Sequence, residues 1–359
     1  MVTYDVIVVG AGPAGSAAAE KCARFGLKTI LLEKEKLPRD KPCGGMFCPS
    51  IRDVVGIYGS SVEDIVERNT DSMKIYFDGE IVLEKRYPAF LFSRDKFDYF
   101  ITKKAIESGA TVVDECRVSD VVIDGSKVKV TSDKGVFVSK IVIGADGVNS
   151  VVAKKTGLNE GFGMDEAALA IETEIKMSNK EIERRYGNCA ILYAHHNFVG
   201  YEWVFPKNGC VNVGLGTKVS KSAKLRERFS EMLERLDLKA DVVKAHMIPL
   251  KLLEKPYSER VILAGDAGGF VFPLVGAGIW PAIISGRAAA DVCYDAVRKD
   301  DYSEKIFAKY LFVCRDIRRD IKTCDMQLKF VELCMKYRIL NPVIAKNFLK
   351  FIDETEKYI

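Results

Sequence analysis

The sequence predicts an α/β protein: one domain with a parallel sheet and a small antiparallel sheet, a second domain built on an antiparallel sheet, and C-terminal helices. Three observations support this fold class. An apolar run at residues 4–9 leads into a glycine-rich turn and a helical segment. Asp78-Gly79 and Asp124-Gly125 interrupt runs of alternating apolar residues, as hairpin turns do. From residue 302 onward, apolar residues recur at helical spacing.

The segment 4–33 carries the most specific motif of the chain. A strand is followed by a G-x-G-x-x-G turn and the start of a helix, at Gly10, Gly12, Ala14 and Gly15. Such glycines permit a tight turn, close approach of a diphosphate to the backbone at the helix N-terminus, and close packing of helix on strand. The next apolar run ends in Glu33, near the position, roughly 20 residues on, of a carboxylate that binds an adenosine ribose. The segment therefore predicts a Rossmann-like domain that binds NAD or FAD.

Composition restricts the classes of function. With 54 basic and 50 acidic residues, the chain of 359 residues has a net charge of +4, too small to indicate nucleic-acid binding. A mildly basic protein can rest on an anionic membrane surface, although the charge alone does not show it. The ten cysteines contain no C-x-x-C pair, so no metal site is predicted, and reduced thiols indicate a cytoplasmic protein.

Two apolar segments are predicted to belong to the fold rather than to a membrane or a signal peptide. The first run lacks a preceding basic region and contains Asp5, which favours a strand. The stretch 261–285 is long enough to span a bilayer, but Asp266, two prolines and several glycines favour a buried strand, a loop and the start of a helix.

Antiparallel strands interrupt the alternation of strands and helices. The second sheet is expected to contain strands at 73–77, 80–84, 87–92, 171–175, 189–194, 200–205 and 209–216, and helices are expected at 95–108, 218–236 and 276–297. His195-His196 lies between two strands without an acidic partner at a useful spacing, which favours a solvent-facing turn over a ligand pair. The predicted division is a dinucleotide-binding domain at 1–70, 94–160 and 255–300, a substrate domain at 71–93 and 161–254, and a helical region at 301–359.

A long loop at 34–50 contains Pro42-Cys43-Gly44-Gly45. Loops of this length in a compact domain are often functional, and the two glycines would let Cys43 bring a thiol and bare backbone close to a ligand. On the residues alone, the simpler alternative is favoured, in which Cys43 is a half-buried apolar residue.

Two further motifs follow the glycine turn in order. They are Gly144-Ala145-Asp146-Gly147, and Ala264-Gly265-Asp266-Ala267 followed by Pro273-Leu274-Val275-Gly276-Ala277-Gly278. With the first motif they resemble the para-hydroxybenzoate-hydroxylase-like FAD flavoproteins over most of the chain. No second complete G-x-G-x-x-G motif offers a separate nicotinamide module, so FAD is expected as the bound dinucleotide.

This resemblance implies roles for individual residues. Asp266 would hold the ribityl chain, and Gly278 with Ile279 would present backbone N–H groups to the flavin ring. Arg94 would lie near the ribityl and diphosphate groups, and Val118 would meet the adenine through its backbone. The remaining cofactor contacts implied in this way are Cys43, Gly44, Met46, Asp146, Gly265 and Gly276.

A narrower resemblance concerns the substrate. Tyr201-Glu202-Trp203-Val204-Phe205-Pro206-Lys207, followed by Val211-Asn212-Val213-Gly214-Leu215-Gly216, is similar to the Y-x-W-x-F-P…V-G-x-G pattern of geranylgeranyl reductases. The Cys43 loop is similar to the cysteine loop that this family places beside the flavin, which reverses the preference for a purely structural Cys43. On a strand, Tyr201, Trp203 and Phe205 would share one face, either as ordinary sheet core or as the wall of a lipid tunnel.

The resemblance implies an FAD-dependent reductase that hydrogenates C=C bonds of a geranylgeranyl chain, and the expected substrate is an archaeal-type membrane ether lipid. Cys43, Tyr201 and Trp203 are the expected catalytic residues. The alternatives are a flavin monooxygenase or halogenase on the same scaffold, or a flavin electron-transfer protein. The external reductant, NAD(P)H or ferredoxin, the lipid head group and the oligomeric state stay open, and we expect transient contact with a membrane surface.

Overall fold

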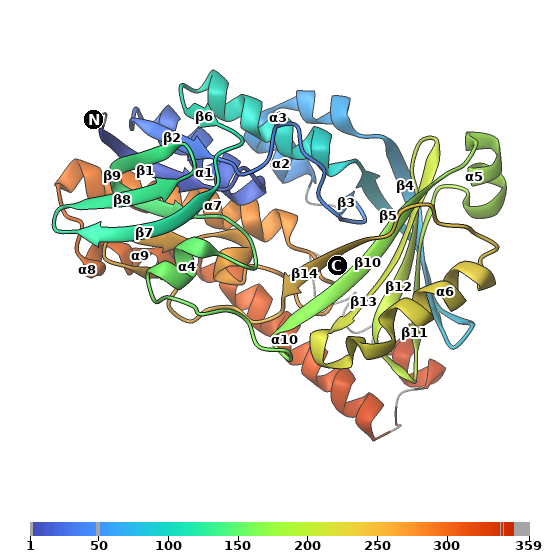
Figure 1. Ribbon diagram of the computed structural model, residues 1–359. Helices are drawn as coiled ribbons and strands as arrows, with labels where there is room; N and C mark the ends of the chain where they lie inside the picture. The colour runs from blue at the N-terminus through green and yellow to red at the C-terminus, as the bar shows by residue number, and fades with distance from the viewer. Residues whose placement is uncertain (1–2, 48–50, 338, 340, 348–359) are drawn as a thin grey trace. The chain divides into compact units, whose positions relative to one another are not determined.

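The computed structural model describes residues 3–47, 51–337, 339 and 341–347 (Figure 1). The chain divides into two compact units. Unit 1 comprises 1–39, 97–166 and 248–326, and unit 2 comprises 40–96, 167–247 and 327–359. The end of the predicted cysteine loop, at 48–50, and the end of the predicted helical region, at 348–359, lie outside the described residues.

A largely parallel sheet forms the centre of unit 1. β1 (Thr3–Val9) lies between β2 (Thr29–Leu32) and β9 (Gly135–Gly144), and all three run parallel. The sheet is extended by β6 (Thr111–Val113), β16 (Val261–Leu263) and the antiparallel β15 (Tyr257–Ser258). Side chains of the central strands are buried on both faces, which explains their uninterrupted apolar runs.

A small antiparallel sheet continues from β9. β7 (Val118–Asp124) pairs with β8 (Lys127–Ser132), and β8 pairs with the first half of β9. The predicted mixture of a parallel sheet and a small antiparallel sheet in one domain is therefore confirmed. α3 (Arg94–Glu107) precedes this part of the chain, and α4 (Val151–Lys155) follows it.

Two helices rich in small residues pack against each other in unit 1. They are α1 (Pro13–Arg24) and α7 (Ile279–Lys299). A Cβ at Gly286 of α7 would lie 2.1 Å from the carbonyl oxygen of Ala14, so only glycine permits this approach. α7 begins three residues later than the predicted 276, because Ala277 still forms a bridge with Phe272.

The C-terminal helices are α8 (Glu304–Phe307), α9 (Lys309–Val313) and α10 (Arg315–Lys336). Tyr310 of α9 anchors this region to the core of unit 1. Its hydroxyl is buried and lies 3.1 Å from the carbonyl oxygen of Leu263 and 3.2 Å from that of Ser285.

Unit 2 is built on the predicted second sheet. In spatial order its strands are β14 (Lys244–Pro249), β10 (Ala167–Lys176), β13 (Cys210–Lys218), β12 (Phe198–Pro206), β11 (Cys189–His195), β4 (Arg68–Phe77), β5 (Glu80–Leu91) and β3 (Met46–Phe47). β3 pairs with β5, and the described residues between 40 and 70 lie in this unit, whereas the sequence-based division placed them in the first domain.

Two predicted elements of unit 2 differ in detail. The strands expected at 80–84 and 87–92 form one strand, β5, because irregularities in its pairing with β4 absorb the change of pattern. The helix expected at 218–236 is a 3₁₀ segment, η2 (Val219–Lys224), followed by α6 (Leu225–Arg235). Two more short elements of unit 2 are α2 (Ile51–Tyr58) and η1 (Ser60–Ile65). The short element η3 (Gly265–Gly268) belongs to unit 1.

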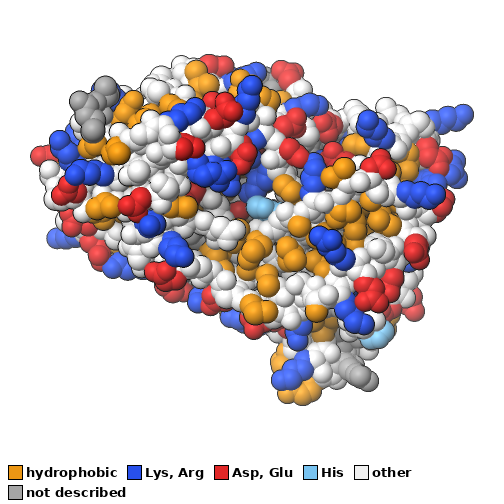
Figure 2. Space-filling model, viewed as in Figure 1, with side chains coloured by type: hydrophobic (Ala, Val, Ile, Leu, Met, Phe, Trp, Pro, Cys, Tyr) orange, Lys and Arg blue, Asp and Glu red, His pale blue; other side chains and the backbone are white. Residues whose placement is uncertain are grey.

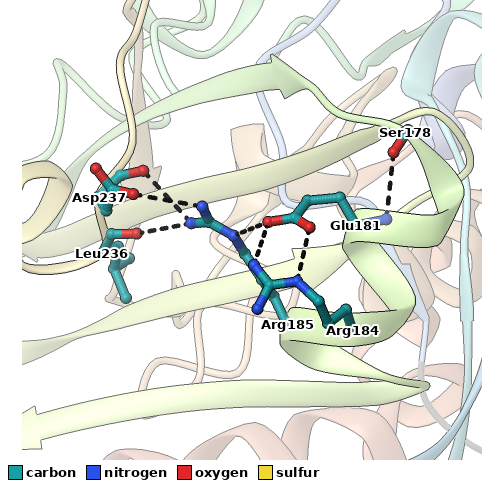
Figure 3. A network of polar contacts seen from close by, with 6 residues as sticks. All are labelled: Ser178, Glu181, Arg184, Arg185, Leu236 and Asp237. Atoms are coloured by element: carbon teal, nitrogen blue, oxygen red, sulfur yellow. Dashed lines mark hydrogen bonds and ion pairs between the residues drawn. The ribbon is translucent and has the colours of Figure 1, made fainter.

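A polar network connects the short helix α5 (Asn179–Tyr186) to the end of α6 (Figure 3). The Ser178 hydroxyl caps α5 by accepting the N–H of Glu181 at 3.2 Å. Glu181 accepts hydrogen bonds from Arg184 and Arg185, and Arg185 also donates to the carbonyl oxygen of Leu236 at 3.2 Å. The network provides hydrogen-bond partners for backbone groups at the N-terminus of α5 and at the C-terminus of α6, so we assign it a structural role.

The histidine pair does have acidic partners, contrary to the sequence-based expectation. His195 Nε2 lies 3.3 Å from Glu202, and His196 Nδ1 lies 3.0 Å from Asp78. Glu202 lies on the neighbouring strand β12, and Asp78 lies in the turn that follows β4, the strand paired with β11. Within the described part of the chain, no helix is both long and apolar enough to cross a bilayer, and no cluster of three metal-ligating side chains occurs.

Candidate functional site

The glycine turn of unit 1 is shaped by close backbone contacts. Gly10 follows β1 with a φ of 99°, and a Cβ there would lie 2.4 Å from the carbonyl oxygen of Ala145. A Cβ at Gly15 would lie 1.8 Å from the carbonyl oxygen of Gly10. Glycine is therefore required at both positions for helix α1 to begin so close to the sheet.

The N-terminus of α1 is prepared for an anion. Gly12 occupies the capping position without a side-chain cap, Pro13 follows it, and the first turn contains no acidic residue. The N–H groups of the first turn and the positive end of the helix dipole are thus left for an external acceptor. A Cβ at Gly12 would meet only the Arg39 guanidinium, 3.6 Å away.

Glu33 lies at the end of β2, as predicted for a ribose-binding carboxylate. Its side chain is buried and accepts the N–H of Ala11 at 2.7 Å and that of Glu35 at 3.1 Å. Arg39 Nε lies 3.4 Å from Glu33, and Arg39 Nη1 lies 3.2 Å from the buried Asp98 of α3. The arrangement orients the carboxylate beside the glycine turn.

Arg39 and Asp98 were not found by reasoning from the sequence. Arg39 stands in a loop without periodicity, and Asp98 is one of several acids in an amphipathic-looking helix. The one available signal was that a charged residue, Arg39, follows soon after the strand that ends in Glu33. The structure places a guanidinium beside the turn at which a diphosphate would lie, so Arg39 joins the candidate cofactor residues.

A second glycine-rich segment of unit 1 holds the predicted flavin-side residues. Gly265 opens η3, where a Cβ would lie 2.8 Å from Ala14, and its N–H donates to the Ser285 hydroxyl at 3.0 Å. Gly276 lies in the loop before α7, whose first residue is Ile279. A Cβ at Gly278 would lie 3.5 Å from Asp266 Oδ1. Asp266 and the uncapped start of α7 are therefore close neighbours.

Three other residues were predicted to contact FAD, and the structure shows the position of each within the protein. Asp146 caps α4, because its carboxylate accepts the N–H groups of Val151 at 2.7 Å and Val152 at 3.1 Å. Val118 is buried at the start of β7, and Arg94 is buried at the first residue of α3. The cofactor contacts of all three remain predictions.

An aromatic row runs along β12 in unit 2. The ring centroids of Tyr201 and Trp203 are 5.9 Å apart, and those of Trp203 and Phe205 are 6.3 Å apart. The expectation that these rings share one face is confirmed. Trp203 and Phe205 are only 7% and 6% exposed, whereas Tyr201 is half-buried, so the row is sheet core at one end and accessible at the other.

The neighbouring strand explains the glycines of the Tyr201–Gly216 pattern. Trp203 lies opposite Gly214 of β13, and Tyr201 lies opposite Gly216. A Cβ at Gly214 would lie 2.2 Å from Trp203 Cζ2, so the indole occupies the space that any side chain would need. The two halves of the pattern are thus one structure, in which aromatic rings lie across a glycine-containing strand.

The Cys43 loop packs on this aromatic row. A Cβ at Gly44 would lie 2.8 Å from the ring of Phe205 and 3.2 Å from Trp203 Nε1. The Cys43 side chain is half-buried, and its Sγ accepts the N–H of Gly45 at 3.4 Å. Met46 packs against the same cluster from β3. The glycines bring the loop backbone onto the aromatic rings, and the thiol stays partly accessible.

A buried hydrogen-bond chain joins the loop to the aromatic row. The Cys43 N–H donates to Glu172 Oε1 at 2.7 Å, and Asn212 Nδ2 donates to Glu172 Oε2 at 3.5 Å. Asn212 in turn accepts the Trp203 Nε1–H at 2.7 Å. Burial raises the pKa of Glu172, against the opposing effects of the Cys43 N–H and Lys207. Glu172 therefore releases its proton at a higher pH than an exposed glutamate does.

The second acid on this face of β10 is paired with a lysine. Lys207 is buried, and its ammonium donates to Glu174 Oε1 at 2.6 Å. Burial lowers the pKa of Lys207, but the carboxylate more than offsets this effect, so the pKa lies above its usual value. Glu172, Glu174 and Lys207 were missed as site residues. Alternating acids in an otherwise apolar strand were the available signal.

Comparisons with known proteins agree with this geometry. The family model described as FAD binding domain matches residues 3–287. A digeranylgeranylglycerophospholipid reductase of Methanocaldococcus jannaschii is 31% identical over 86% of this chain and 81% of its own length. The chain belongs to the geranylgeranyl reductase family of FAD-binding proteins. A chloroplastic geranylgeranyl diphosphate reductase of Nicotiana tabacum is 32% identical over 85% of this chain and 70% of its own.

A solved structure has the same fold. The geranylgeranyl bacteriochlorophyll reductase-like protein of Thermoplasma acidophilum superimposes with a TM-score of 0.83, at 24% identity, over 96% of this chain and 90% of that one. This reductase-family chain is accordingly an FAD-dependent oxidoreductase. The tight glycine turn, the open space at Gly12 and the buried Glu33 fit the adenosine diphosphate part of FAD.

Proposed function

We propose that this protein reduces the isolated C=C bonds of a geranylgeranyl or similar polyprenyl chain carried by a membrane ether lipid. The observation that carries the proposal is the contact between the Cys43 loop and the aromatic row of β12, in which Gly44, the residue after Cys43, lies against the rings of Phe205 and Trp203. Two relatives at more than 30% identity are named for the reduction of geranylgeranyl compounds, which supports the same substrate class.

The residues of unit 1 provide cofactor binding. Gly10, Gly12 and Gly15 with the start of α1 would hold the FAD diphosphate, Glu33 the adenosine ribose, and Asp266 the ribityl chain. When bound and reduced, FAD would supply the hydride equivalent for one alkene carbon. The reducing equivalents would come from NAD(P)H or from a ferredoxin-type protein, which a donor assay distinguishes.

The residues of unit 2 supply the chemistry that an unactivated alkene needs. No carbonyl group is available to be polarised, so positive charge would develop on one alkene carbon as the other carbon takes a proton, and the hydride would then go to the charged carbon. The π face of Tyr201, the accessible ring of the row, stabilises such a charge, and Trp203 supports that ring from behind. The second carbon takes a proton, for which the Cys43 thiol is the candidate donor.

An anaerobic single-turnover experiment tests this function. The flavin of the purified holoenzyme is reduced chemically, a digeranylgeranyl glycerophospholipid is added in detergent, and flavin reoxidation is followed together with product mass. The expected result is reoxidation without air and a gain of two hydrogens for each double bond reduced. Oxidation only after air is admitted, with an oxygen atom in the product, would assign the protein to the monooxygenases instead.

A parallel comparison tests the head group. Geranylgeranyl diphosphate and geranylgeraniol are offered under the same anaerobic conditions. We expect the glycerophospholipid to reoxidise the flavin fastest. A preference for the diphosphate would retain the reductase and reject the membrane ether lipid. A flavin that no polyprenyl compound reoxidises, but that exchanges electrons with a protein donor, would indicate an electron-transfer protein.

A further inference from the structure

The C-terminal helix α10 has one buried side and one exposed side. Ile317, Ile321 and Cys324 are buried and lie on the inward side over about two turns. The 22 residues of α10 make it about 33 Å long. Its composition on the opposite side is unusual for a solvated surface, because large apolar residues alternate there with basic ones.

The basic residues of α10 recur at an interval of seven. Arg315, Lys322, Lys329 and Lys336 are all exposed. A repeat of seven drifts by only about 20° for each heptad on a helix with 3.6 residues per turn, so the four side chains follow one side of α10. Arg319 is exposed on the same side, between the first two members of the repeat.

Large apolar side chains accompany this basic row. Met326, Phe330, Leu333 and Tyr337 are 63%, 48%, 52% and 61% exposed. Their spacing of three or four residues places them in one stripe beside the lysines. Figure 2 shows hydrophobic and basic atoms next to each other at the bottom of the view, where the C-terminal end of α10 lies in Figure 1.

The first turn of α10 continues this surface. Phe312, just before it, is 67% exposed and lies 4.4 Å from the Arg315 guanidinium. A shallow groove of about 410 Å³ is lined by Arg315, Arg319, Lys322 and Met326, among others. Three acids lie beside it: Asp316 and Asp320 lie 3.5 Å and 3.4 Å from Arg319, and Glu254 lies 3.1 Å from Lys322. The face as a whole is basic.

We propose that this face of α10 docks the protein on the surface of a bilayer that contains anionic lipid. A helix with basic and large apolar residues on its exposed side can lie in the plane of the interface, with the apolar side chains in the acyl boundary and the basic ones among phosphate groups. The role that we give to docking rests on the proposed function, because a polyprenyl lipid substrate is itself held in a bilayer.

The charge pattern favours a bilayer over a second copy of the chain. A two-fold interface through this face would bring the basic row of one copy against the basic row of the other. Burial of the apolar stripe would then have to overcome repulsion between like charges. An anionic lipid surface satisfies both the charges and the apolar side chains at once.

Vesicle sedimentation of the FAD-loaded protein tests the proposal. Vesicles of phosphatidylcholine alone are compared with vesicles that also contain phosphatidylglycerol. The test variant is Arg315→Gln, Lys322→Gln, Lys329→Gln and Lys336→Gln combined. The matched control changes four exposed lysines elsewhere to glutamine, namely Lys34, Lys127, Lys180 and Lys239. Both variants lose the same charge.

We expect the wild type and the control to bind the anionic vesicles, and the α10 variant to bind them about tenfold or more weakly, since each basic residue at an anionic surface contributes to binding. Leu333→Ser with Tyr337→Ser should weaken the binding that remains at high salt. The proposal would be overturned if the α10 variant and the control bound the vesicles equally, or if the wild type did not bind them. It would also be overturned if the wild type formed a dimer that the α10 variant does not form.

Reduction of detergent-dispersed lipid separates this proposal from the proposed function. The α10 variant should keep wild-type turnover in detergent, because the substitutions lie outside the catalytic residues. If the wild type binds vesicles but reduces no polyprenyl lipid, the proposed reductase function is rejected and the membrane-docking proposal for α10 stands. If the wild type reduces lipid in detergent but does not bind anionic vesicles, only the membrane-docking proposal for α10 is rejected.

Discussion

The backbone N–H of Cys43 donates to Glu172 Oε1 at 2.7 Å, although the two residues are 129 positions apart in the chain. This bond attaches the cysteine loop to β10. Through Asn212 the same carboxylate is connected to the indole of Trp203. The loop, the acid and the aromatic row therefore form one unit, and several predictions depend on it.

Removal of the Cys43 thiol should impair alkene reduction without loss of the cofactor. Cys43→Ala keeps the backbone N–H that binds Glu172, so the loop should stay in place. We expect retained FAD, an unchanged melting temperature, and a slower rate of anaerobic flavin reoxidation by lipid. Cys293→Ala, at a buried cysteine of α7, is the control for loss of a thiol elsewhere. Unchanged turnover in Cys43→Ala would dismiss the catalytic role.

Glu172→Gln should change how stability depends on pH. Burial raises the pKa of Glu172 above its ordinary value of 4.5, so the folded protein retains a proton that the unfolded chain releases. Wild-type stability therefore falls as the pH rises from about 4.5 through the folded-state pKa. The glutamine variant lacks this ionisation, and its free energy of unfolding should decline less over the same range. The facing charged groups, Lys207 and Glu174, are unchanged.

Urea denaturation at a series of pH values measures this difference. The same variant tests whether Glu172 delivers protons to Cys43, because the pH profile of lipid reduction should then lose one of its ionisations. A merely structural glutamate would alter stability and leave the shape of the kinetic profile unchanged. A variant with the wild-type dependence of stability on pH would show that Glu172 is not the group that retains the proton.

Gly214→Ala should disturb the aromatic row, because the new Cβ would lie 2.2 Å from Trp203 Cζ2 and 2.7 Å from the carbonyl oxygen of Ile171. We expect destabilisation of about 1–3 kcal/mol, as for other overpacked cores, and a changed tryptophan fluorescence. Gly216→Ala is the matched control on the same strand, since its Cβ would meet nothing closer than 3.5 Å. Equal effects of the two substitutions would contradict the packing argument.

Arg39→Gln should weaken FAD binding. Arg39 is the cation beside the glycine turn and the partner of Glu33 and Asp98. A charge-assisted contact is worth about 1.5–3 kcal/mol, so we expect the Kd for FAD to rise by about tenfold or more. Titration of the apoprotein by flavin fluorescence measures it. Arg117→Gln, at an exposed arginine of unit 1, should leave the affinity unchanged.

Glu202→Gln should lower stability at neutral pH. Glu202 is 1% exposed on the face of β12 opposite the aromatic row, and it pairs with Arg235, with Arg228 at 3.3 Å and with His195 at 3.3 Å. Burial acts to raise its pKa, but His195 and Arg235 outweigh this effect, so the pKa lies below 4.5. Stability from Glu202 is therefore present above pH 4.5 and lost as the pH falls through the folded-state pKa.

The loss in this variant should be about 1–3 kcal/mol, because the buried carboxylate is replaced by an amide that pairs less well with the half-buried Arg228 and the exposed Arg235. Urea unfolding at neutral pH measures this loss. Glu231→Gln serves as the control, because Glu231 is exposed on α6, the helix that carries Arg228 and Arg235. A loss no greater than that of the control would show that the ion pairs contribute little.

Local chemistry explains which features were predictable from the sequence. The Gly10–Glu33 unit depends on contacts among residues close in the chain, because a strand, a tight turn and a helix follow one another there. The shared face of Tyr201, Trp203 and Phe205 follows from the two-residue period of a strand. Irregular pairing between β4 and β5 and the late start of α7 were not predictable, since both depend on neighbours distant in the chain.

By itself the sequence determined the class of fold, the dinucleotide motif and the aromatic pattern, because each depends on residue order over a few turns or strands. Tertiary structure decided which polar groups serve those motifs. Glu172 meets Cys43, and Asn212 meets Trp203, only because β10 and β13 are neighbours in one sheet and in one register. Hydrogen bonds act over about 3 Å, so strand order, which no local pattern encodes, selects the partners.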